Sequence, residues 1–336
     1  MYEAFYNLSA KPFQLNPDPN FFFASRGHKR AMSYLEYGLH QGEGFIVITG
    51  DIGAGKTTLV RNLFQQVETQ TMVAAQLVST QLDADDTLRL IAAAFGLPHE
   101  DVSKAGLLKK IEDFLLSCNR QGRRALLVVD EAQNLTPRAV EELRMLSNFQ
   151  LGEKSLLQSF LLGQPEFRQT LQGEGMRQLR QRIIASYHLG PMDAVETRAY
   201  IEHRLHMVGW QSDPTFSDEA LQAIYDFTGG IPRKINTLCD RLMLFSYLEE
   251  LHAIEAATVN DVISDLQSEM TLPATQVNGV HRDEQKGAAA PAEDGITLSQ
   301  LDTRVSRMER SLRNILKLSR EILEATGAKR PEKEER

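Results

Sequence analysis

The sequence predicts an α/β fold with a five-stranded parallel sheet, from two observations. Five short aliphatic runs bounded by turn residues indicate buried strands, at Gly44–Thr49, Met72–Val78, Arg124–Val129, Leu156–Leu162 and Ser186–Leu189. Helical patterns separate these runs, at Thr57–Gln66, Ala84–Phe95, Ala105–Asn119, Ala139–Phe149 and Glu166–Leu171. Because strand and helix alternate, we expect a layered core over residues 44–190 with right-handed crossovers.

A small all-helical unit is expected to follow the core, over residues 191–268. Its helix signals are a capping-box variant at Asp193–Glu196, an N-cap at Ser217, the paired Gly229 and Gly230, Pro232 at a first turn, and an apolar pattern over Thr258–Leu266. We therefore predict four helices here. Residues 1–43 are expected to pack on the core.

The C-terminal part changes composition twice. Residues 269–297 are rich in Pro, Ala, Gly and charge, which predicts a flexible linker. Residues 298–326 then show a heptad pattern, which predicts a coiled-coil helix that pairs with itself or with a partner helix. The seam residues are Leu298, Leu301, Val305, Met308, Leu312, Ile315, Ser319 and Ile322. A charged tail, residues 327–336, completes the chain.

Composition excludes several classes of protein. The 336 residues suggest about two domains, and two cysteines cannot form a disulfide framework. No apolar run approaches the roughly 18 residues that a membrane span needs, and the N-terminus shows no signal-peptide pattern. The net charge of −8 gives no general attraction to nucleic acid. We expect a cytoplasmic protein without a transmembrane segment.

A phosphate-binding loop follows the first predicted strand. The residues match G-x-x-x-x-G-K-[ST] between a strand and a helix, the context that the motif requires. They are Gly50, Asp51, Ile52, Gly53, Ala54, Gly55, Lys56 and Thr57, with Thr58 next. Backbone N–H groups and the helix N-terminus would hold phosphate, Lys56 would contact the β- and γ-phosphates of ATP, and Thr57 would ligate Mg²⁺. A turn without a ligand is the alternative, which the combined match disfavours.

Two carboxylates, Asp130 and Glu131, follow the third predicted strand. The carboxyl end of such a strand is where α/β sheets bind ligands. We expect Asp130 to hold Mg²⁺, directly or through water, and Glu131 to deprotonate the attacking water. Such a pair is often only a solvated loop start, but the upstream loop favours a role in hydrolysis.

These motifs, in this order, resemble an AAA+ ATPase. Further segments resemble the secretion ATPases of the general-secretion-pathway protein A type, in the branch found in exosortase (PEP-CTERM) and exopolysaccharide loci. They are Lys11–Pro19 (KPFQLNPDP), Phe21–Phe23, His28–Gly38 (HKRAMSYLEYG), Gly44–Gly50 (GFIVITG), Asp130–Leu135 (DEAQNL) and Leu162–Glu166 (LGQPE). The resemblance covers about residues 1–266 and implies an AAA+ core with a helical lid.

The resemblance also implies roles for single residues. Gln164 ends the fourth strand, where the superfamily keeps a polar sensor of phosphate or water, although relatives often have Asn or Thr. Arg233 lies in a segment similar to the second sensor motif and would reach the γ-phosphate from the lid; a surface arginine is the alternative. Arg182, or Arg180 close by, would cross to the nucleotide of a neighbouring subunit, but a solvated basic helix face would have the same pattern.

The N-terminal aromatic residues allow two interpretations. Phe13, Pro17, Phe21–Phe23 and His28 could line an adenine pocket, although such residues more often serve packing.

The resemblance implies an oligomeric ATPase that supports export or assembly at the cell envelope. It would serve protein sorting or exopolysaccharide secretion through membrane-associated partners, and could lie peripherally at the inner membrane. One alternative is a nucleotide-switched DNA-binding adaptor of the transposition type, which the acidic charge and the lack of an evident helix-turn-helix disfavour. Another is a scaffold whose coiled coil performs the main task.

Overall fold

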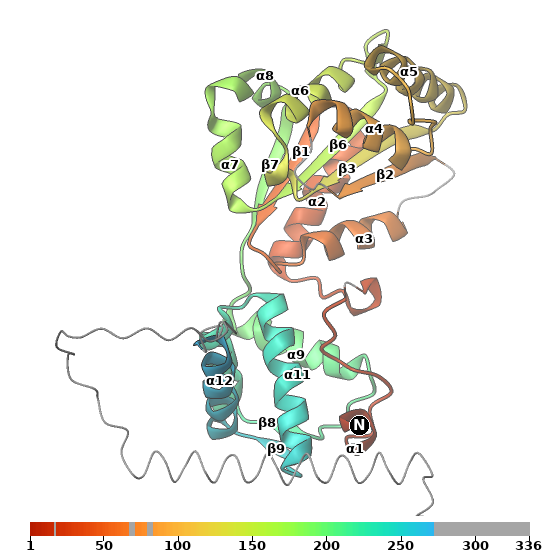
Figure 1. Ribbon diagram of the computed structural model, residues 1–336. Helices are drawn as coiled ribbons and strands as arrows, with labels where there is room; N and C mark the ends of the chain where they lie inside the picture. Colours follow the sequence, from red (N-terminus) through yellow and green to blue (C-terminus); the bar gives the residue numbers. More distant parts are fainter. Residues whose placement is uncertain (17, 67–70, 79–82, 272–336) are drawn as a thin grey trace, which may run out of the picture. The chain divides into compact units, whose positions relative to one another are not determined.

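The computed structural model describes residues 1–16, 18–66, 71–78 and 83–271. Its centre is a five-stranded parallel sheet with the strand order β2-β3-β6-β1-β7 (Figure 1). The strands are β1 (Phe45–Gly50), β2 (Met72–Val78), β3 (Arg124–Asp130), β6 (Leu157–Gly163) and β7 (Ile183–Leu189). The predicted parallel sheet is therefore confirmed, and each predicted run forms one of its strands.

Helices cover both faces of this sheet. One face carries α2 (Arg26–Gln41) and α3 (Lys56–Gln66); the other carries α4 (Ala84–Ala94), α5 (Lys104–Arg120), α6 (Pro137–Leu146) and α7 (Pro165–Gln172). The side chains of β1 alternate between the two faces. Phe45 packs with the face that carries α4 to α7, and Ile46 packs with the face that carries α2 and α3. Burial on both faces explains the near-continuous apolar runs of the inner strands β1 and β3, whereas the edge strands β2 and β7 are only partly buried.

A helical unit follows the sheet, built from α9 (Ala194–His206), α10 (Asp218–Thr228), α11 (Pro232–Leu248) and α12 (Ala256–Thr271). The start of α9 is capped as expected, because the Asp193 side chain accepts a hydrogen bond from the Glu196 N–H at 2.8 Å. Gly229 ends α10 in the left-handed conformation. The unit also contains a short parallel pair, β8 (Thr215–Phe216) and β9 (Ala253–Ile254), which the sequence did not suggest.

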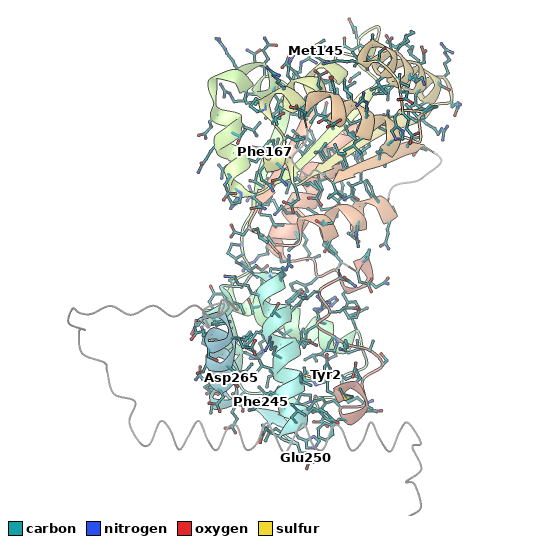
Figure 2. The ribbon with its side chains drawn as sticks, in the orientation of Figure 1. Tyr2, Met145, Phe167, Phe245, Glu250 and Asp265 are labelled. Carbon is teal, nitrogen blue, oxygen red and sulfur yellow. The ribbon has the colours of Figure 1, made fainter. Side chains whose placement is uncertain are left out.

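The N-terminal segment divides between the two parts, which differs from the expectation that residues 1–43 pack on the α/β core. Helix α2 packs on the sheet, but α1 (Tyr2–Phe5) and Phe13 belong to the apolar cluster of the helical unit. Tyr2, labelled in Figure 2, is buried in this cluster, and its hydroxyl donates to Asp240 Oδ1 at 2.6 Å. Large aromatic residues bury most area where matching apolar surface is available, and here α9 and α11 offer it.

Shorter elements complete the described chain. They are the β4–β5 hairpin (Gln150–Leu151 and Lys154–Ser155), α8 (Arg177–Arg180) and three 3-10 turns at Pro19–Phe21, Ala132–Asn134 and Glu174–Met176. Among these described elements, no helix has the length and apolar character needed to span a membrane. The linker was predicted to begin at residue 269, but α12 continues to Thr271 because its helical hydrogen bonds extend past the predicted boundary. The rest of the predicted linker, the predicted coiled coil at residues 298–326 and the charged tail at residues 327–336 lie outside the described residues.

Candidate functional site

The loop between β1 and α3 is shaped by glycines and by Lys56. Gly53 and Gly55 have φ values of +81° and +94°, which residues with a Cβ rarely adopt. The Lys56 Nζ donates to the carbonyl of Gly50 at 2.7 Å and to that of Asp51 at 2.9 Å. Burial lowers the pKa of Lys56, while the carboxylates of Glu131 and Asp130 act in the opposite direction. A buried ammonium group thus lies beside the loop, next to the N-terminus of α3.

Thr57 and Asp130 lie together at the carboxyl edge of the sheet. The Thr57 hydroxyl donates to Asp130 Oδ2 at 2.7 Å, and Asp130 is almost fully buried. The sheet brings the two residues together because β3 and β1 both end at this edge, although 73 positions separate them. A hydroxyl and a carboxylate are hard oxygen ligands, so the pair fits Mg²⁺.

Glu131 follows Asp130 in a strained backbone conformation and is held by two amides. Its φ is +54°, uncommon for a residue with a side chain. Its Oε2 accepts hydrogen bonds from Gln133 Nε2 at 2.6 Å and from Gln164 Nε2 at 3.2 Å. The Gln164 N–H donates in turn to Gln133 Oε1 at 2.9 Å. The carboxylate therefore has a fixed direction.

Gln133 was missed by the sequence analysis. It lies in the Asp130–Leu135 segment, two residues after the carboxylate that it contacts. The spacing of two residues could have predicted this contact, because a long amide side chain can reach back across a tight turn to the carboxylate of Glu131.

Arg233 places the start of α11 against the phosphate-binding loop. Its backbone N–H donates to the Gly53 carbonyl at 3.2 Å. A Cβ on Gly53 would lie 2.3 Å from the Cβ of Arg233, so only glycine allows this approach. The expected lid residue thus lies beside the loop.

One cavity of about 420 Å³ joins the loop to the helical unit and the N-terminal segment. Its walls include Lys56, Thr57 and Glu131 together with Arg233. Of the expected adenine-pocket residues, Phe21–Phe23 and His28 line this cavity. Phe13 does not line it, because it is buried in the apolar cluster of the helical unit; Pro17 lies outside the described residues.

His28 links α2 to the phosphate-binding loop. Its Nδ1 lies 2.7 Å from Ser25 Oγ, and its Nε2 lies 3.1 Å from the Ala54 carbonyl oxygen. Burial lowers the pKa of this imidazole, which favours the neutral ring.

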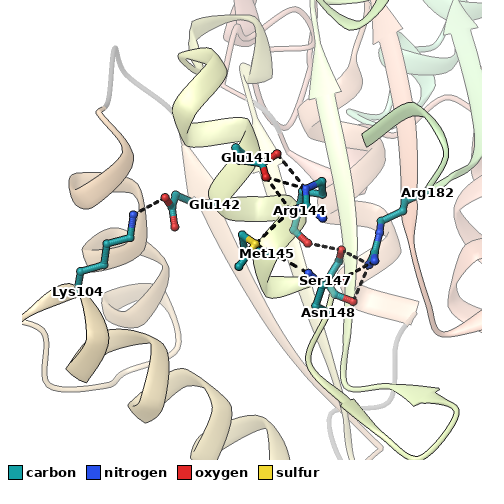
Figure 3. A network of polar contacts seen from close by, with 8 residues as sticks. All are labelled: Lys104, Glu141, Glu142, Arg144, Met145, Ser147, Asn148 and Arg182. Carbon is teal, nitrogen blue, oxygen red and sulfur yellow. Dashed lines mark hydrogen bonds and ion pairs between the residues drawn. The ribbon is translucent and has the colours of Figure 1, made fainter. Parts of the chain in front are cut away.

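Arg182 lies at the opposite edge of the sheet. It directly precedes β7, whose first residue pairs with the first residue of β1. Its guanidinium donates to Ser147 Oγ at 2.8 Å, to the Ser147 carbonyl and to Asn148 Oδ1 (Figure 3). Arg180 donates to the carbonyls of Leu171 and Gly173 at 2.6 and 2.9 Å. Neither arginine is brought to the phosphate-binding loop of its own chain.

Comparisons with known proteins agree with this geometry. Residues 39–171 match the model of the family described as an AAA domain. The chain is 39% identical over 285 residues to general secretion pathway protein A of Aeromonas hydrophila, covering 84% of this chain. The chain spans about half the length of that relative, 50%.

Solved structures share the fold at low sequence identity. The ORC2 protein of Aeropyrum pernix, in its ADPNP–ADP complexes, has a TM-score of 0.59 and 17% identity, covering 79% of this chain and 75% of that one. Cdc6p of Pyrobaculum aerophilum has a TM-score of 0.58 and 15% identity, covering 78% and 74%. These likenesses concern the fold alone.

Residues 39–171 thus carry an AAA-type domain, with the five-stranded parallel sheet and the strand–loop–helix segment of the P-loop class. Over most of its length, this chain is similar to general secretion pathway protein A.

Proposed function

We propose that this protein hydrolyses ATP with Mg²⁺ at the edge where β1, β3 and β6 end. The observation that carries the proposal is that Lys56, Thr57 and Glu131 line one cavity, with Asp130 hydrogen-bonded to the Thr57 hydroxyl. A cation for the phosphates, oxygen ligands for a metal ion and a carboxylate base are the groups that phosphoryl transfer to water requires.

Each residue has a distinct task in this proposal. Lys56 exchanges its loop carbonyls for the β- and γ-phosphates, and Thr57 and Asp130 hold Mg²⁺, which neutralises phosphate charge when bound. Glu131 accepts a proton from the attacking water. Gln133 and Gln164 orient its carboxylate, and Arg233 contacts the γ-phosphate from α11.

The proposed wider role rests on the relative. General secretion pathway protein A suggests work in export or assembly at the cell envelope, with membrane-associated partners. The finer proposals are a place in exosortase or exopolysaccharide loci and an oligomer in which Arg182 completes the site of a neighbouring subunit. Oligomeric assembly agrees with the position of Arg182 at the edge of the sheet opposite its own loop.

The test is steady-state ATP hydrolysis of the full chain with Mg²⁺, beside ATP binding by calorimetry. Lys56→Ala is expected to lose at least about a hundredfold in ATP affinity, because the buried ammonium is gone. Glu131→Gln is expected to bind ATP normally and to lose about 10²- to 10⁴-fold in rate. Lys29→Ala, at an exposed position of α2, is the matched control. Normal hydrolysis by either site variant would refute the assignment.

A second measurement addresses the alternative role. Anisotropy of a labelled DNA duplex, with and without a non-hydrolysable ATP analogue at physiological salt, is expected to show no tight binding. Tight nucleotide-dependent binding would instead favour a DNA-binding adaptor.

A further inference from the structure

Arg204 is a buried cation in the wall of the cavity, far along the chain from the phosphate-binding loop. The residue is only 5% exposed, and α9 carries it. Within the described ranges, no carboxylate forms an ion pair with it; its partners are two backbone carbonyls and a hydroxyl. A buried guanidinium without an anion is costly, so its position calls for a reason beyond packing.

Arg204 holds the N-terminal segment that forms part of the cavity wall. We call residues 12–16 and 18–23 the strap. Arg204 Nε donates to the Pro12 carbonyl at 2.6 Å, and Nη2 donates to the Gln14 carbonyl at 3.4 Å. Its guanidinium also lies 4.9 Å from the ring centre of Phe21. One side chain thus fixes both the backbone and an aromatic ring of the strap beside the cavity.

Arg204 also begins a chain of hydrogen bonds that sets the direction of an amide. Its Nη1 donates to the Tyr200 hydroxyl at 2.8 Å, and that hydroxyl donates to Asn236 Oδ1 at 2.9 Å. Because Oδ1 is engaged, the Nδ2 donor of Asn236 is left over, and no described residue accepts from it. Asn236, Tyr200 and Arg204 all line the cavity.

The cavity therefore has two chemically different regions. The loop, Lys56 and Arg233 supply charge for phosphates, whereas the strap supplies the rings of Phe21–Phe23 and the Asn236 amide lies nearby. Flat apolar surfaces with a single directed donor suit a heterocyclic ring that carries a hydrogen-bond acceptor. A nucleoside is the part of a nucleotide with these properties.

We propose that Arg204, Tyr200 and Asn236 form the nucleoside-recognition relay of this cavity. Asn236 Nδ2 donates to an acceptor atom of the base, while Tyr200 and Arg204 are positioning residues that hold the amide and the strap. This inference rests on the nucleotide binding proposed above. It extends that proposal, since it assigns to the relay the part of the affinity that the phosphates do not supply.

The test compares two probes by calorimetry on the full chain with Mg²⁺: ATP, and inorganic tripolyphosphate, which has no nucleoside. Tyr200→Phe keeps the ring but breaks the relay, and Asn236→Ala removes the donor. Both are expected to weaken ATP binding about tenfold, the effect of one directed hydrogen bond, and to leave tripolyphosphate binding within about twofold. Tyr225→Phe, on α10, is the matched control and should change neither affinity.

Arg204→Lys and Arg204→Met test the positioning role, with melting curves to verify folding. The lysine variant keeps the charge but loses the planar set of N–H donors, and the methionine variant loses both. Both variants are therefore expected to weaken ATP binding more than tripolyphosphate binding. An equal loss of affinity for ATP and for tripolyphosphate would overturn the relay while leaving the proposed function intact. Normal ATP affinity in Tyr200→Phe and Asn236→Ala would do the same. A wild-type chain that binds neither probe would overturn both proposals.

Discussion

Gln164 Nε2 donates a hydrogen bond to Glu131 Oε2 over 3.2 Å, which ties the residue after β6 to the residue after β3. Strands β3 and β6 are hydrogen-bonded neighbours, so their carboxyl ends deliver the amide and the carboxylate to one place. Gln133 donates to the same oxygen. The direction of the proposed base is therefore determined by two amides.

Removing the Gln164 amide should slow turnover without weakening binding. Gln164→Ala is expected to lower kcat by about 10- to 100-fold, because the Glu131 carboxylate is then less well oriented. The ATP affinity from calorimetry should stay within about twofold. Gln169→Ala, an exposed position on α7, is the control. An unchanged kcat in Gln164→Ala would contradict the orienting role.

Substitution of Gly53 should disturb the contact between the loop and α11. Gly53→Ala adds a Cβ at positive φ and 2.3 Å from Arg233 Cβ, whereas Gly209→Ala adds one at φ +83° with open space around it. In chemical denaturation, Gly209→Ala should lower the free energy of unfolding by about 1 kcal/mol. Gly53→Ala should lower the free energy of unfolding by about 1–3 kcal/mol more, because the added Cβ overpacks the contact with Arg233. This variant should also bind ATP more weakly. Equal losses would show that the close approach has no energetic consequence.

Acidification should destabilise the protein through His28. Burial lowers its pKa below the ordinary value of 6.5, so the unfolded chain binds the proton more readily. The stability that neutral His28 contributes is therefore present above about pH 6.5 and is lost as the pH falls through the folded pKa. His28→Gln should reduce the fall in melting temperature between pH 7.5 and 5, measured by calorimetry at about half-unit steps.

Two comparisons sharpen that experiment. His203 also has a pKa lowered by burial, so part of the slope should persist in His28→Gln. His40→Gln, at an exposed position of the same helix, is the control. An identical pH slope in His28→Gln and the wild type would exclude the contribution of His28.

Mixing two inactive variants tests whether Arg182 acts on a neighbouring subunit. Arg182→Ala and Glu131→Gln should each lose hydrolysis. A one-to-one mixture should recover activity in about a quarter of the sites, those that combine an intact base with an intact neighbouring arginine. Asn148→Ala, which removes one partner of Arg182 but keeps the guanidinium, is the control for local structure. No recovery on mixing would indicate that Arg182 acts only within its own chain.

The sequence by itself determined the sheet strands and the local motifs. The apolar run at Gly44–Thr49 predicts a buried strand, and the structure has β1 at Phe45–Gly50, because a short apolar run between turn residues indicates burial on both faces. The loop at Gly50–Thr57 and the pair Asp130–Glu131 are each contiguous, so spacing alone indicates their chemistry. Caps such as Asp193 are likewise local, and their hydrogen bonds span only three residues.

Only the tertiary structure decided which distant residues meet. Arg204 and Pro12 are 192 positions apart, and no sequence pattern in either segment predicts their contact. The same holds for Tyr2 and Asp240, whose contact places the N-terminus in the helical unit. Periodicity shows that a side chain is buried but not against what, because many apolar surfaces of the same size satisfy it equally. Here the N-terminal aromatic residues pack against α9 and α11, and residues of these two helices form one wall of the cavity.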